Sequence, residues 1–150
     1  VDLAGEYGLP FRLPACFTDE QFSNQMLGIK IDKQLVLGMF AQFAKYTKEK
    51  KVATPDYLMP GDWAGPQKES FENYREYIFE LYRSFVPGAV TETYIHPAVE
   101  SDELKAITSS WQHRVWEYQL FKDSETQKYF HSIGVELINY RQLKEMRGFA

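Results

Sequence analysis

The chain has 150 residues, 44% of them hydrophobic and 25% charged, which suits one soluble globular domain with a sizeable core. Its net charge of −4 argues against a nucleic-acid surface as the main function, and its single cysteine excludes an intrachain disulfide or a multi-thiolate metal site. No apolar run reaches transmembrane length and no secretory signal pattern opens the chain. We therefore expect a cytoplasmic protein with neither a membrane nor a nucleic-acid partner.

The first part of the chain is predicted to alternate between extended segments and helices. Residues 9–13 form a short extended segment with prolines near both ends. Residues 18–21 form a capping box for a helix that Gly28 would end, and Asp32 is a candidate N-cap for a longer helix. The longer helix is marked by apolar residues at helical spacing, which are Leu35, Met39, Phe43 and Tyr46.

The middle of the chain contains the helix that the sequence predicts most clearly. Residues 55–59 are expected to form a strand, and the Pro- and Gly-rich run at 60–66 predicts a loop within one domain. The helix that follows has an apolar face at the 3.6-residue period and ends before Pro87 and Gly88. This face consists of Phe71, Tyr74, Ile78, Leu81 and Phe85.

The last part is predicted to be mainly helical. Helices are expected to begin at residues 100–102, to cover 111–122, to run from a capping box at 124–127 to Gly134, and to cover 141–146. Residues 135–140 alternate in polarity and predict a strand. Because strands separated by helices are typical of parallel βαβ units, we expect an α/β fold in a single domain spanning residues 1–150.

Residues 90–97 predict a strand that stops at a histidine. Pro97 cannot donate to a sheet ladder, so the strand would end with the imidazole of His96 at its carboxyl end. The carboxyl ends of strands are where α/β folds carry their catalytic and binding residues. Glu92 lies on the same face, about 13 Å earlier at strand rise, so it cannot orient the imidazole directly. Glu92 is a candidate for substrate binding, or for packing against another part of the fold. An edge-strand histidine without a function is the alternative for His96.

Further side chains are candidates for a site. Arg12 lies near the end of the extended segment at residues 9–13, and its guanidinium could hold a carboxylate in a bidentate geometry, although a surface arginine is an equal alternative. Aromatic residues make up 16% of the chain, and most of them are expected to serve packing. Trp63, Trp111 and Trp116 are candidate platforms for a sugar ring. The chain has three histidines and no His-x-x-x-His pattern, so no complete metal site is expected within it.

Four blocks of sequence resemble successive blocks of the YdjC/ChbG carbohydrate deacetylase family. They are LPFR at residues 9–12, TETYIHP at 91–97, WQHRVWEY at 111–118 and GVELINYR at 134–141. The resemblance implies that the chain is the C-terminal half of a distorted (β/α) barrel with parallel strands. It also implies metal-assisted removal of acetyl groups from N-acetylated sugars, typically chito-oligosaccharides.

The resemblance implies roles for individual residues. His96 would be the general acid that protonates the leaving amine, and Arg12 would orient a catalytic carboxylate contributed by the other half. A divalent metal, Mg or Zn, would be held by an aspartate and two histidines of that half, so no cofactor and no activity are expected for these 150 residues alone. Ala98 departs from the glycine that is common in the family after His-Pro, which puts the local loop shape in question.

Two alternatives to an enzyme remain open at this point. The chain could be a non-catalytic α/β domain that binds a small carbohydrate, or one that binds another protein. Half a barrel would expose strand edges, so in the deacetylase interpretation we expect association into homo-oligomers.

Overall fold

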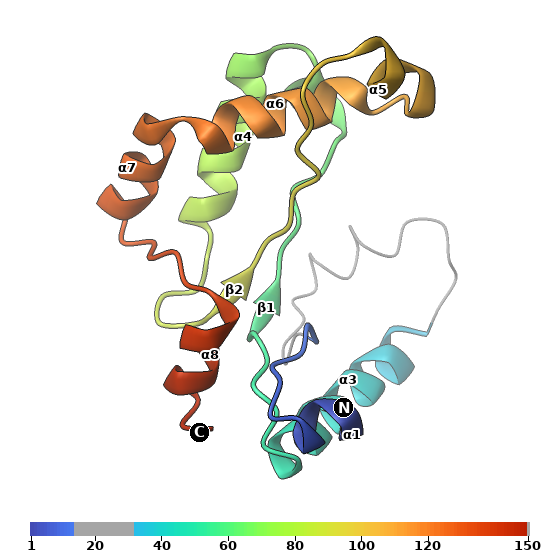
Figure 1. Cartoon of the computed structure of the whole chain (residues 1–150), viewed down its shortest axis with the longest axis vertical. Helices are drawn as coiled ribbons and strands as arrows, with labels where there is room; N and C mark the ends of the chain where they lie inside the picture. The colour runs from blue at the N-terminus through green and yellow to red at the C-terminus, as the bar shows by residue number, and fades with distance from the viewer. Residues whose placement is uncertain (14–31, 150) are drawn as a thin grey trace. The chain divides into compact units, whose positions relative to one another are not determined.

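The computed structural model describes residues 1–13 and 32–149 (Figure 1), which form two compact units. Unit 1 comprises Val1–Met59, Val86–Glu92 and Ile138–Ala150. Unit 2 comprises Pro60–Phe85 and Thr93–Leu137. The helix predicted between the capping box at 18–21 and Gly28 lies outside the described residues. None of the helices in the described part of the chain is long and apolar enough to span a bilayer.

The described residues of unit 1 form three helices and a parallel pair of short strands. The helices are α1 (Asp2–Glu6), α3 (Lys33–Glu49) and α8 (Tyr140–Met146), and the strands are β1 (Tyr57–Leu58) and β2 (Thr91–Glu92). Tyr57 is in register with Thr91, and Leu58 with Glu92. The predicted parallel arrangement of these two strands is therefore confirmed.

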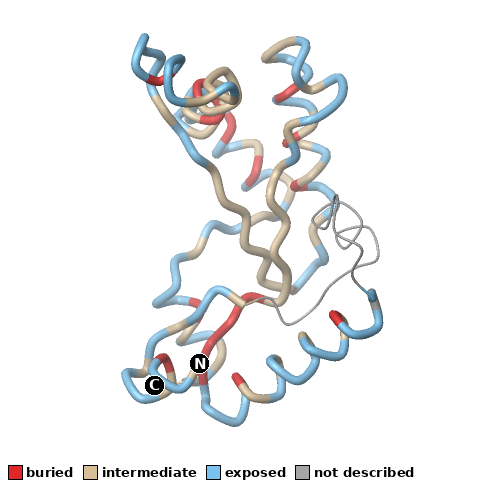
Figure 2. Tube along the Cα trace, turned by 90° about the vertical axis from the view of Figure 1, so that its right-hand side faces the viewer, coloured by how far each residue is buried: buried red, intermediate tan, exposed pale blue. Residues whose placement is uncertain are grey.

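The N-terminus of α3 confirms a prediction made from the sequence. The Asp32 carboxylate accepts hydrogen bonds from the N–H groups of Gln34 and Leu35, at 2.8 and 3.4 Å. These bonds satisfy two of the backbone donors that an α-helix leaves unpaired at its start. Much of α3 is exposed, whereas the buried residues of unit 1 include the run 52–55 that leads into β1 (Figure 2).

The predicted strands are much shorter than expected, because their backbone donors have other partners. In the segment 9–13, Phe11 N–H donates to the Ala53 carbonyl at 2.9 Å, but Pro10 has no N–H to continue a ladder. In the segment 135–140, Val135 N–H turns back to the Phe130 carbonyl at 2.9 Å, and Asn139 is the N-cap of α8. The prediction of a strand at 135–140 is therefore wrong, and the predicted extended segment 9–13 joins no sheet. The described residues show a helix-rich α/β arrangement with one two-stranded sheet.

Unit 2 is built from four α-helices and one short 3₁₀ helix. They are η1 (Gly65–Lys68), α4 (Phe71–Arg83), α5 (Asp102–Ile107), α6 (Trp111–Lys122) and α7 (Ser124–Ser132). The predicted bounds of α6 are confirmed, and α4 begins where predicted, after the N-cap Ser70. The N-cap of α7 is Asp123 rather than Ser124, and Gly134 has a φ of +82° just beyond its end.

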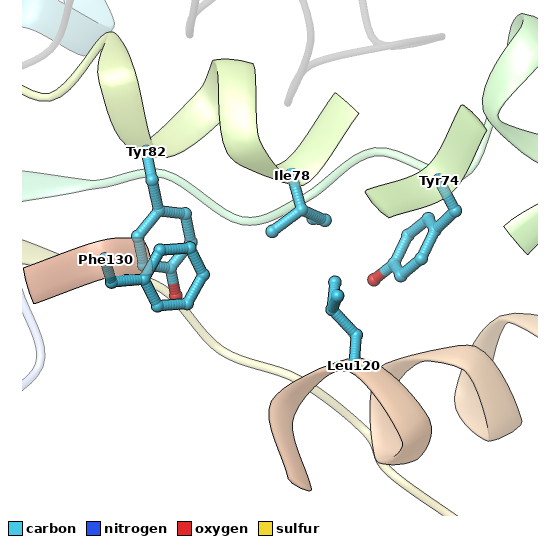
Figure 3. Packing of buried hydrophobic residues seen from close by; sticks show 5 residues of the cluster. All are labelled: Tyr74, Ile78, Tyr82, Leu120 and Phe130. Carbon is cyan, nitrogen blue, oxygen red and sulfur yellow. The ribbon is translucent and has the colours of Figure 1, made fainter. Parts of the chain in front are cut away.

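The core of unit 2 lies between α4, α6 and α7 (Figure 3). It consists of Tyr74, Ile78, Tyr82, Leu120 and Phe130, each at most 4% exposed. The three residues from α4 recur every four positions, so one face of the helix is buried. The rings of Tyr82 and Phe130 stack with their centroids 4.0 Å apart. The other residues of the predicted apolar face, Phe71, Leu81 and Phe85, are partly buried against this core.

Candidate functional site

His96 lies in unit 2 on an irregular segment that α6 holds in place. Its backbone N–H donates to Glu117 Oε2 at 2.8 Å, and the next available donor, Ala98 N–H, bonds to the Arg114 carbonyl at 3.0 Å. The His96 donor is therefore used by a side chain rather than by a neighbouring strand. His96 itself is exposed, and its ring lies edge-on to Tyr94 with the centroids 5.5 Å apart.

Alanine fits the position after His96-Pro97. Among the described residues, Lys51 is the only non-glycine with a positive φ. Ala98 therefore has an ordinary backbone conformation that requires no glycine, and its N–H is paired. The local loop shape is compatible with this departure from the family pattern.

Glu117 is a buried carboxylate that joins two parts of unit 2. It is 3% exposed, and this burial raises its pKa, while the His96 N–H and the nearby charges of His96 and Arg114 act in the opposite direction. While Oε2 accepts from His96, Oε1 lies 3.3 Å from His113 Nε2. This distance is short enough for an ion pair, but the orientation does not meet hydrogen-bond geometry.

His113 and Trp63 belong to an aromatic cluster behind Glu117. Burial lowers the pKa of His113 to about 4, so its imidazole is neutral at neutral pH. Its ring is stacked on Trp63, with centroids 4.5 Å apart and an interplanar angle of 3°. Tyr74 and Trp116 contact Trp63 edge-on, at 5.8 and 5.4 Å. Trp63, predicted to be a sugar platform, thus has one face covered by His113, and its role in substrate binding stays a prediction.

Arg12 and Glu92 come together in unit 1, where Tyr140 joins them. Arg12 Nε donates to Glu92 Oε1, and the Tyr140 hydroxyl donates to Glu92 Oε2 at 2.5 Å. Burial, followed by the hydrogen bond to Glu92, raises the pKa of Tyr140 to about 12, so the phenol keeps its proton. The Arg12 side chain is 53% exposed and that of Glu92 is 12% exposed. The guanidinium thus reaches solvent while its partner is mostly buried.

The structure places the predicted site residues in two groups. Arg12 and Glu92 form an ion pair in unit 1, and Trp63 is connected to His96 through His113 and Glu117 in unit 2. Sequence analysis missed three participants, which are His113, Glu117 and Tyr140. The spacing of His113 and Glu117 was a usable signal, because residues four apart share one face of a helix. Tyr140 had no comparable signal.

The described residues do not supply a set of metal ligands. Within residues 1–13 and 32–149, no group of three or more His, Cys, Asp or Glu side chains could hold a metal ion. The pair His113 and Glu117 provides only two donors, and one of them already binds a backbone N–H. These residues therefore do not fit the divalent metal that the resemblance implies.

Comparisons with known proteins agree with the first three sequence blocks, whereas the block at 134–141 lies beyond the residues that the family model matches. A family model described as YdjC-like protein matches residues 1–132. A crystal structure of a "putative cellobiose-phosphate cleavage protein" from Enterococcus faecalis V583 is similar, with a TM-score of 0.56, 21% sequence identity and 94% of this chain covered. The chain spans 44% of that protein's length, and at this identity the likeness shows the fold alone. Among curated proteins, no sequence matches the chain.

Proposed function

Because the chain belongs to the YdjC-like protein family, a carbohydrate deacetylase-like family, we propose that it is part of a metal-dependent carbohydrate deacetylase. The substrates would be N-acetylated sugars such as chito-oligosaccharides, and the bond hydrolysed would be the N-acetyl amide. Since the chain spans 44% of the similar Enterococcus faecalis protein, the activity is proposed for the full-length protein. Its metal ligands would lie outside the residues described.

The observation that supports this proposal is the setting of His96. Amide hydrolysis requires a proton for the departing nitrogen, because an amide anion is a poor leaving group. Histidine is the side chain that exchanges protons near neutral pH. His96 is exposed while its backbone is held by a buried carboxylate, so its ring can meet a substrate from a defined position. We therefore assign His96 as the general acid.

In this proposal Arg12 orients a catalytic carboxylate, and Glu92 supports Arg12. Both carboxylate oxygens of Glu92 already accept hydrogen bonds, one from Arg12 and one from Tyr140. Any contact between Glu92 and a sugar hydroxyl would share an oxygen with these two bonds. Support of Arg12 is therefore the first role we propose for Glu92, with substrate binding as the second.

The proposal is tested by acetate release from di-N-acetylchitobiose by the full-length protein in the presence of a divalent metal. We expect His96→Ala to lower turnover by about 10²- to 10⁴-fold, the usual contribution of a general acid. The matched control is His131→Ala, since His131 is also exposed but lies on α7, and we expect it to keep native turnover.

Each outcome of this experiment decides a specific point. Native turnover by the His96→Ala variant would refute the role of His96. If the unmodified protein released no acetate but bound the sugar, the result would favour a non-catalytic sugar-binding domain instead.

A further inference from the structure

We propose that Glu117 is a positioning residue for His96, which holds the histidine through its backbone rather than through its ring. The inference rests on the proposed role of His96 as a general acid. Glu117 is the only acidic or basic residue that is buried in the described part of the chain. Burial of a carboxylate is unfavourable unless its oxygens have partners, so its position requires an explanation.

The contacts of α6 fix the segment on both sides of Pro97. Glu117 Oε2 accepts from His96 N–H at 2.8 Å, and the Arg114 carbonyl accepts from Ala98 N–H at 3.0 Å. Pro97 has no N–H, and its ring restricts both its own φ and the backbone of His96. Because the N–H groups of His96 and Ala98 are both bound to α6, the main freedom that His96 retains is rotation about its side-chain torsions. The ring of Tyr94, 5.5 Å away and edge-on, lies beside the imidazole.

The Glu117 carboxylate that binds the His96 N–H also lies next to His113. Its other oxygen lies 3.3 Å from His113 Nε2, and the His113 ring is stacked on Trp63. Trp63 in turn contacts Tyr74, a residue of the buried core. The position of His96 is thereby linked to the buried core of unit 2.

The hydrogen bond from His96 N–H requires an acceptor at residue 117 but no negative charge. His113 is neutral, because burial lowers its pKa to about 4, and burial raises the pKa of Glu117. The charged groups near the pair are His96 and Arg114, together with Asp62 and Lys68 for His113. A carboxamide would keep the bond that holds His96, since its oxygen can accept from His96 N–H. A leucine of similar size would lose this bond.

This difference provides the test in the full-length protein. The variants are Glu117→Gln, Glu117→Leu and, as a control at an exposed glutamate of α7, Glu125→Leu. The readouts are hydrogen exchange of the His96 amide and the kcat and KM of acetate release over a range of pH. We expect Glu117→Leu to speed exchange at least tenfold and to lower kcat at least tenfold, with KM within threefold of native. Glu117→Gln and Glu125→Leu should stay within threefold of native in exchange, kcat and pH profile.

Several results would overturn the inference. In the unmodified protein, exchange of the His96 amide at the rate of an unprotected amide would refute the inference. This measurement needs no variant, so it also decides the case in which Glu117→Leu does not fold. Native kcat in Glu117→Leu, or equal losses in Glu117→Leu and Glu117→Gln, would also refute it. Absence of acetate release by the unmodified protein would overturn the proposed function, whereas exchange of the His96 amide would still show whether Glu117 holds this backbone.

Discussion

Replacement of Leu120 by alanine is expected to destabilise unit 2 strongly. Leu120 is 1% exposed and points from α6 toward Ile78 and Tyr74 of α4 (Figure 3). The substitution removes three carbon atoms, which corresponds to about 2.4 kcal/mol of lost transfer free energy at ~0.8 kcal/mol for each. The cavity left behind raises the total to about 3–5 kcal/mol. The better helix propensity of alanine returns only a few tenths of a kcal/mol, roughly, so it does not change the sign.

The chain offers a matched control for this substitution. Leu137 also belongs to unit 2 but is 64% exposed, so Leu137→Ala should cost about 1 kcal/mol or less. Urea unfolding of the 150-residue chain can be followed by tryptophan fluorescence, because all three tryptophans, Trp63, Trp111 and Trp116, lie in unit 2. We expect the midpoint to fall by about 1.5–2.5 M for Leu120→Ala, at a slope near 2 kcal/mol per M. Equal shifts for the two variants would refute the assignment of Leu120 to the core.

Two further predictions concern titration and the ion pair of unit 1. Burial lowers the pKa of His113 from 6.5 to about 4, so its contribution to stability is complete above pH 6.5 and is lost as the pH falls toward 4. His113→Phe keeps a ring against Trp63 and should therefore flatten this acid loss in urea midpoints measured from pH 7 to 4; an identical pH dependence would contradict the prediction. Glu92→Gln should change the free energy of unfolding by less than about 1 kcal/mol, because Arg12 is half exposed. In the full-length protein the same variant should lower acetate release at least tenfold, and native turnover would show that Arg12 does not depend on Glu92.

The helices could be predicted because their determinants are close together in the sequence. The N-cap contact of Asp32 spans two and three residues, and the buried face of α4 is defined by residues four apart. The interactions that decide such an element lie within one or two helical turns. This is why the bounds of α6 and the start of α4 agree with the prediction.

The strands were predicted poorly because a strand depends on a partner elsewhere in the chain. Residues 90–97 have the composition of a strand, yet only Thr91–Glu92 pairs with β1. Beyond that pair, a side chain of α6 binds the donor of His96. Composition and alternation predict an extended backbone, but they do not identify the partner of each N–H group.

In the candidate site, too, the local features could be predicted from the sequence and the long-range contacts could not. The sequence alone determined the candidates His96 and Arg12, because a histidine before a proline and an arginine in an extended segment are local features, and it determined the family. Only the tertiary structure decided that Glu117 holds His96 and that Tyr140 shares Glu92 with Arg12, since these partners are 21, 48 and 80 positions apart. The physical reason is that hydrogen bonds and burial depend on distance in space, and chain folding brings together residues whose sequence separation predicts no contact.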